Sequence, residues 1–162
     1  MIYSSACAYA IRALSRLAIM RPDGYLLLED LCAGTDLPRH FVAKIFQDLV
    51  RRGLLSSAKG RGGGFALARK PDQITLLEIV SNVDGVEQLE HCVVGMDRCD
   101  DHQPCPQHDI WKGIRSQLRT FLKDTSLQTM AMTLKKKMEL LGQVPPEPSS
   151  ASKPVRGADA AV

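Results

Sequence analysis

Three cysteines and one histidine stand close together in the second half of the chain, and they offer its most evident chemistry. They are Cys92, Cys99, Cys105 and His108. Thiolate and imidazole side chains suit iron–sulfur clusters and zinc. The gaps between the cysteines, six and five residues, are longer than those of ferredoxins or zinc knuckles. The sequence therefore predicts a metal site and leaves the metal open.

Two other interpretations of this segment remain. The three cysteines and His108 could hold structural zinc, or Cys92 or Cys99 could form a disulfide on oxidation without any metal. An odd, clustered set of cysteines in a reducing compartment favours metal or redox chemistry over a disulfide framework. Cys7 and Cys32 lie among apolar neighbours, so we expect them in the core.

The elements that must position this site are mostly helical. Apolar residues recur at three- and four-residue steps in several segments, which is typical of amphipathic helices. We expect helices over about 3–20, 29–33, 38–52, 76–80, 110–123 and 127–141. Between the third and fourth, two short apolar runs at 54–57 and 65–68 flank a loop with four glycines. They predict a β-hairpin.

A helix, a short helix, a turn, a helix and a glycine-rich hairpin form the plan of a winged helix-turn-helix. In that plan the second helix of the pair enters the major groove of DNA, and the hairpin contacts the backbone or the minor groove. The predicted fold class is therefore mainly α with a small β-hairpin wing, followed by a long helix. Four segments are expected: a winged helix-turn-helix (1–85), a cysteine-rich loop (86–109), C-terminal helices (110–141) and a disordered tail (142–162).

The distribution of charge supports a nucleic-acid partner. The whole chain carries 21 Lys and Arg against 18 Asp and Glu, a net charge of only +3. Residues 38–70 hold eight of the positive residues and a single acid, Asp48, so this stretch carries +7 and the rest carries −4. A local positive field of this size is typical of DNA-binding proteins.

Helix geometry selects the side chains that could reach DNA. The face opposite the apolar stripe of the third helix carries Arg39, His40, Ala43, Lys44 and Gln47, and the wing carries Lys59 and Arg61. These seven are predicted to contact base edges or phosphates. The alternative is a solvated basic helix face beside an ordinary flexible loop.

Several classes of protein are disfavoured. The 162 residues suggest one domain, and aromatic residues at 5% argue against single-strand stacking. The chain has no Walker loop, serine elbow or metalloprotease motif, so we do not expect an enzyme. Neither a membrane span nor a secretory signal is recognisable, so we expect a cytoplasmic protein without a membrane partner. An iron–sulfur electron or cluster carrier would have no use for the basic wing.

Three further patterns are specific when they occur together, although the glycine run alone is a weak signal. They are Tyr9-Ala10, the run from Gly60 to Leu67, and the run from Ile74 to Val80. With the three-cysteine loop and the long helix after it, the chain resembles the IscR-type family of bacterial winged-helix repressors, which includes the nitric-oxide sensor NsrR. The resemblance covers about residues 1–141.

The resemblance implies a homodimer that binds a double-stranded DNA operator. It implies an iron–sulfur cluster held by Cys92, Cys99 and Cys105 and one further ligand, and His108 matches the histidine of the IscR branch. A [2Fe–2S] cluster is favoured, with [4Fe–4S] as the alternative. The state of the cluster would alter DNA affinity in response to redox, iron or nitric oxide. The long helix would pair with that of the partner through its apolar stripe: Trp111, Ile114, Leu118, Phe121 and Leu122. The nitric-oxide branch uses an acidic residue near the chain start, where this chain has Ala8.

Overall fold

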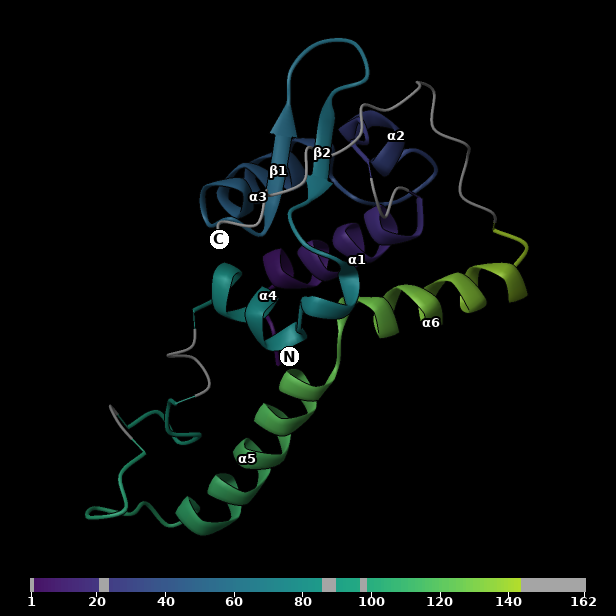
Figure 1. The fold of residues 1–162 in the computed structure, drawn as a ribbon. Helices are drawn as coiled ribbons and strands as arrows, with labels where there is room; N and C mark the ends of the chain where they lie inside the picture. Colours follow the sequence, from purple (N-terminus) through teal and green to yellow (C-terminus); the bar gives the residue numbers. More distant parts are fainter. Residues whose placement is uncertain (1, 21–23, 86–89, 97–98, 144–162) are drawn as a thin grey trace, which may run out of the picture.

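A computed structural model describes residues 2–20, 24–85, 90–96 and 99–143 of the chain. Its elements, in chain order (Figure 1), are α1 (Ser5–Met20), α2 (Leu28–Cys32), α3 (Arg39–Arg51), β1 (Leu55–Ala58), β2 (Gly64–Leu67), the 3₁₀ turn η1 (Pro71–Gln73), α4 (Leu76–Val83), α5 (His108–Asp124) and α6 (Leu127–Leu140). The predicted fold class, mainly α with a hairpin wing, is confirmed. Parts of the predicted cysteine-rich loop (86–89 and 97–98) and most of the predicted tail 142–162 lie outside the described residues.

Helix α1 is the centre of the fold. Helices α2, α3, α4 and α6 all pack against it, and Ala10, Leu14 and Leu17 along it are fully buried. Cys7 is also fully buried, and Cys32 packs at the edge of the same core, as the sequence predicted. This core fixes α3, so that the outer face of α3 is rigidly presented.

Helix α3 ends where the wing begins. Gly53 adopts a positive φ of 75°, and the next amide, that of Leu54, donates to the carbonyl oxygen of Leu49 at 3.0 Å. Such a turn is a common helix terminator. It directs the chain into β1, which pairs with β2 in antiparallel orientation. Leu55 lies opposite Leu67 at one end of the pairing, and Ala58 lies opposite Gly64 at the other.

Two glycines allow close backbone contacts at the wing, one with the body and one within the hairpin. Gly64 lies against the carbonyl of Leu26, where an added Cβ would come within 2.2 Å of the oxygen, and Gly63 lies against Ala58 in the same way. Leu26 and Phe65 exchange two backbone hydrogen bonds of 2.9 Å. These glycines therefore serve the packing of the wing itself.

The junction between α5 and α6 is fixed to the body by two backbone hydrogen bonds. The amide of Leu76 donates to the carbonyl of Thr125 at 2.9 Å, and the amide of Leu127 donates to that of Ile74 at 2.8 Å. Ser126 caps α6 by accepting from the amide of Thr129. From this junction the 17 residues of α5 extend for about 25 Å. The cysteine loop thus lies at the end of the molecule opposite the wing (Figure 1).

Two local features at α3 depart from what its sequence favours. Neither Thr35 nor Asp36 caps the helix: the Oγ1 of Thr35 accepts from the amide of Leu37, and Asp36 pairs with Arg12. Phe41 is one of the apolar residues of this helix, but it is 42% exposed and packs edge-on against Tyr9, with ring centroids 5.8 Å apart. The helix starts at Arg39, so Phe41 lies in its first turn, at the edge of the core.

Candidate functional site

The outer face of α3 carries the predicted DNA contacts. Arg39, His40, Lys44 and Gln47 are exposed and Ala43 is half-buried. The opposite face holds Val42, Ile45, Phe46 and Leu49, all buried. Arg39 lies 3.7 Å from a carboxylate oxygen of Glu29 on α2, an exposed pair that DNA can displace at little cost.

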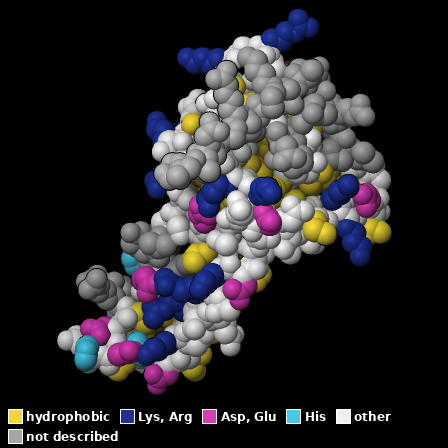
Figure 2. Space-filling model, in the orientation of Figure 1, with side chains coloured by type: hydrophobic (Ala, Val, Ile, Leu, Met, Phe, Trp, Pro, Cys, Tyr) yellow, Lys and Arg dark blue, Asp and Glu magenta, His cyan; other side chains and the backbone are white. Residues whose placement is uncertain are grey.

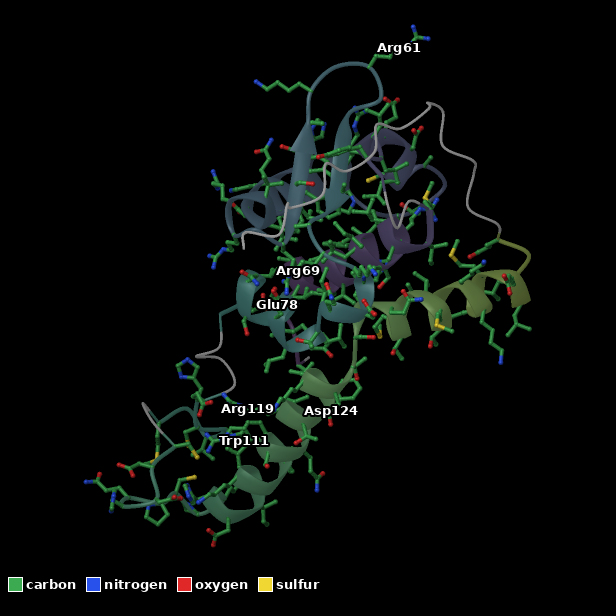
Figure 3. All side chains as sticks on the ribbon, viewed as in Figure 1. Arg61, Arg69, Glu78, Trp111, Arg119 and Asp124 are labelled. Atoms are coloured by element: carbon green, nitrogen blue, oxygen red, sulfur yellow. The ribbon has the colours of Figure 1, made fainter. Side chains whose placement is uncertain are left out.

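The wing extends this basic surface. Figure 3 shows Arg61 at the tip of the hairpin, pointing away from the body, and Figure 2 shows Lys and Arg side chains projecting from that end of the molecule. Within the described part of the chain, no carboxylate pairs with Lys44, Lys59 or Arg61. In contrast, Arg51 pairs with Asp48 and Arg69 with Glu78. In that part of the chain, cations without an ion-pair partner therefore lie both at the wing tip and on α3.

The four predicted metal ligands lie in two pairs. The Sγ atoms of Cys92 and Cys105 are 3.6 Å apart, and the Sγ of Cys99 is 3.4 Å from Nδ1 of His108. Cys92, Cys105 and His108 are buried, at 6%, 9% and 4% exposure. His108 begins α5, two residues before the predicted start at 110, and its amide donates to the carbonyl of Cys105 at 2.9 Å.

Both separations fit two ligands on one tetrahedral ion. With bonds of about 2.3 Å to sulfur and 2.0 Å to nitrogen, such ligands lie roughly 3.5–3.8 Å apart. Among the residues that the structure describes, no three His, Cys, Asp or Glu side chains converge as a site for a single ion. The four side chains therefore lie as two separate pairs.

The two thiols of the buried pair differ in acidity. Hydrogen bonding from the backbone N–H of Val94 lowers the pKa of Cys92. At Cys105 the backbone N–H of Gln107 acts in the same direction, but burial and the neighbouring Cys92 outweigh it and raise the pKa. The thiolate is the form that binds metal, and the backbone N–H of Val94 favours that form at Cys92.

Polar residues that the sequence did not single out surround the histidine. Asp101 Oδ1 lies 2.6 Å from Nε2 of His108, and Lys112 Nζ lies 2.7 and 2.8 Å from the two Asp101 oxygens. Hydrogen bonds first from Lys112 and then from His108 lower the pKa of Asp101 to about 2. A cavity of about 490 Å³ opens beside Cys99 and Asp101. This opening gives small molecules access to the cysteine loop.

One face of α5 holds the cysteine loop in place. The indole N–H of Trp111 donates to the carbonyl of His91 at 3.0 Å, Arg115 donates to that of Glu90 at 3.3 Å, and Arg119 pairs with the Glu90 carboxylate. Figure 3 shows Trp111 and Arg119 on the side of α5 that faces the loop. The four-residue spacing of Trp111, Arg115 and Arg119 could have indicated that they share a helix face. Their partners in the loop follow no sequence pattern.

The predicted dimer stripe is divided by the structure. Ile114 and Phe121 are each 50% exposed, and Ile110, which the prediction omitted, is 73% exposed. Leu118 is half-buried against the core, and Trp111 serves the loop. Leu122 is fully buried within this chain, because α5 meets α4 there. It is therefore not part of a face that a partner could cover.

Comparison with known proteins identifies the family. Residues 3–133 match the family described as Rrf2, iron-dependent transcriptional regulator. A putative HTH-type transcriptional regulator of Aquifex aeolicus is 34% identical over 80% of this chain and 91% of its own length. The HTH-type transcriptional regulator IscR of Aliivibrio salmonicida is 29% identical over 74% of this chain and 70% of its own.

Solved structures show the same fold. CymR, the global cysteine regulator of B. subtilis, superposes with a TM-score of 0.66 at 24% identity, covering 80% of this chain and 95% of its own. T. potens IscR gives 0.64 at 19% identity, covering 83% and 88%. No helix in the described residues has the length and apolar character to cross a membrane. The chain is a DNA-binding transcriptional regulator, not an enzyme, and it belongs to the Rrf2 family.

Proposed function

We propose that this regulator is a homodimeric repressor whose affinity for its operator is set by an iron–sulfur cluster. The cluster is [2Fe–2S], bound by Cys92, Cys99, Cys105 and His108. The observation that carries the proposal is the pairing of these ligands at 3.6 and 3.4 Å, the separations expected of two ligands on each of two tetrahedral ions. The IscR relatives support it.

DNA binding is assigned to α3 and the wing. In a helix-turn-helix protein the N-terminal residues of the second helix contact base edges, which selects Arg39, His40, Ala43, Lys44 and Gln47. Lys59 and Arg61 at the wing contact phosphates or the adjacent minor groove. A dimer places its two α3 helices about 34–36 Å apart, or a multiple of this, so the operator is an imperfect palindrome. Such a regulator acts in the cytoplasm.

The dimer is assigned to the exposed apolar face of α5. Ile110, Ile114 and Phe121 lie on one side of the helix, with Leu118 at its edge. Burying such side chains stabilises an interface by roughly 25 cal/mol per Å² of apolar surface. Because α5 also carries His108, the same helix belongs to the dimer contact and to the cluster site.

This arrangement can transmit the state of the site to DNA. When bound, the cluster supplies redox-sensitive bonds that cross-link the loop to the first turn of α5. The chain's own residues do the rest: Trp111 and Arg115 fix the loop to α5, and Leu122 fixes α5 to the body. Releasing His108 and the cysteines frees the loop and shifts the balance between two placements of the DNA-binding units.

A second candidate is a thiol switch without metal. The thiols of Cys92 and Cys105 are 3.6 Å apart, so that oxidation can join them, and CymR of S. aureus has been solved in an oxidised form. Structural zinc on the three cysteines and His108 is a further alternative.

The test is anaerobic purification from iron-supplied cells, followed by assay of iron, zinc and acid-labile sulfide. The proposal predicts a coloured protein with iron and sulfide in equal amounts. DNA fragments selected from the source genome should bind with affinities that change when the cluster is removed. Colourless protein with zinc would contradict the proposal, and colourless protein with thiols that oxidise reversibly would favour the thiol switch.

A further inference from the structure

His108 has a defined polar partner on each nitrogen of its ring. Nδ1 lies 3.4 Å from the Sγ of Cys99, and Nε2 lies 2.6 Å from Oδ1 of Asp101. The ring is only 4% exposed, so water competes little for either nitrogen. Its orientation is therefore determined by these two neighbours.

The chemistry of the partners determines which nitrogen can bind a metal. A neutral imidazole has one N–H donor and one lone pair, and an ionised carboxylate only accepts hydrogen bonds. Beside Asp101, Nε2 must therefore carry the proton. Nδ1 then keeps its lone pair and directs it toward Cys99. A ligating histidine commonly donates its other N–H to a carboxylate in this way, which fixes the tautomer and makes the ring a stronger ligand.

Asp101 is itself held by the same helix. Lys112 lies one turn after His108 on α5, and its Nζ donates to both oxygens of Asp101 at 2.7 and 2.8 Å. Residues four apart share a helix face, so His108 and Lys112 together grip one carboxylate of the loop. The side chain of Asp101 is 64% exposed, so it is not part of the core. Its contacts with His108 and Lys112 are therefore not explained by core packing.

We propose that Asp101 is the positioning residue that fixes His108, through Nε2, with Nδ1 as the cluster-binding atom beside Cys99, and that Lys112 fixes Asp101. This rests on the proposed iron–sulfur function. Cys99 and His108 would then share one iron, and Cys92 and Cys105 the other. The neighbouring Asp100 provides a matched control, because its carboxylate accepts from the amide of His102 rather than from His108.

The first experiment uses metal-free, reduced, full-length protein. Asp101→Ala and Asp100→Ala are compared with the wild type by NMR of histidine ring N–H protons, and the His108 signal is assigned by its loss in His108→Ala. We expect a downfield, slowly exchanging Nε2–H signal in the wild type and in Asp100→Ala, and its loss in Asp101→Ala. Its retention in Asp101→Ala, or its absence from the wild type, would overturn the proposal.

The second experiment uses the same three proteins, purified anaerobically with iron. We expect Asp101→Ala to lose its cluster to a chelator about 10-fold faster than the wild type, a common effect of removing such a partner. We also expect its reduction potential to rise, because the ring becomes a weaker donor. Asp100→Ala controls for the loss of a nearby charge. It should change the rate of cluster loss and the reduction potential less than Asp101→Ala does.

The outcomes separate the two claims. Wild-type protein that lacks iron and sulfide would overturn the proposed function, and this proposal with it. If the wild type holds a cluster, but Asp101→Ala loses its cluster at the same rate and has the same reduction potential, this proposal alone would be overturned. Equal effects of Asp101→Ala and Asp100→Ala would also overturn it, because they would reflect charge rather than positioning.

Discussion

The indole N–H of Trp111 lies 3.0 Å from the carbonyl oxygen of His91 and donates to it. Through this bond the first half of the cysteine loop is attached to α5, one turn after the helix begins at His108. The segments that carry Cys92 and Cys105 are thereby held on one helix: Cys92 follows His91 directly, and the carbonyl of Cys105 accepts from the amide of His108. The ligand pair Cys92–Cys105 depends on both attachments.

Removing this hydrogen bond should loosen the cysteine loop. Trp111→Phe keeps a ring but loses the donor, and a single hydrogen bond contributes about 0.5–1.5 kcal/mol. We expect the cluster to be lost to a chelator several-fold faster, with the far-UV circular dichroism unchanged. Gln117→Ala, an exposed position on the same helix, is the control. Equal rates in wild type and Trp111→Phe would show that the bond does not hold the loop.

The wing should contribute to DNA affinity through Arg61. Arg61→Ala removes an unpaired cation at the wing tip, and a specific arginine contact contributes roughly 1–3 kcal/mol. We expect operator binding about 10-fold weaker or more, with a shallower dependence on salt and an unchanged dimer. Arg69→Ala is the matched control, because Arg69 pairs with Glu78 on α4. Fluorescence anisotropy measures both, and equal losses would contradict the assignment to the wing tip.

The exposed apolar face of α5 should hold the dimer. Ile114→Glu places a charge on that face, so we expect a monomer by light scattering and weaker binding to a palindromic operator. The control is Met132→Glu on α6, at a side chain that is 63% exposed, which should remain a dimer. Leu122→Ala should instead lower the free energy of unfolding by about 2–5 kcal/mol, as core truncations do. A dimeric Ile114→Glu would exclude this face.

Cys7 should make the protein less stable at alkaline pH. Burial, and secondarily the nearby Asp84 carboxylate, raise the pKa of this thiol to about 12, whereas an unfolded cysteine titrates near 8.5. Between these values the unfolded state releases a proton that the folded state keeps. Stability should therefore fall as pH rises above about 8.5, by up to roughly 1.4 kcal/mol per pH unit.

The measurement for Cys7 is urea unfolding at several pH values. Cys7→Ala should show a shallower decline of unfolding free energy between pH 8.5 and 10.5 than the wild type. Cys32→Ala is the comparison, because its thiol lies near Arg16 and Arg39, which oppose the effect of burial on its pKa. Parallel curves for wild type and Cys7→Ala would show that this thiol titrates normally.

The sequence predicted most of the fold because the elements are set by local patterns. The recurrence of apolar residues at three- and four-residue steps located α1, α3, α5 and α6 to within about two residues. Leu122 was misassigned for a physical reason. Periodicity reports which residues share a helix face, but the face of α5 changes from partner-facing to core-facing where α4 meets it, and that contact joins distant parts of the chain.

The candidate site was predictable only in part. The cysteines and His108 stand out by type and spacing, but their division into two pairs depends on a loop with no periodicity. Asp101 and Lys112 gave no signal, because a charged residue in a polar loop and one on a helix surface are ordinary. Their meeting at His108 depends on where the loop folds onto α5.

The central claim is that Cys92, Cys99, Cys105 and His108 hold an iron–sulfur cluster. The most direct measurement is the iron, zinc and acid-labile sulfide content of the anaerobically purified full chain, taken with its absorption spectrum, for wild type and for Cys99→Ser. The account predicts about two irons and two sulfides per chain with visible charge-transfer bands, and loss of both in the variant. A colourless wild type with one zinc per chain, or with no metal, would contradict it.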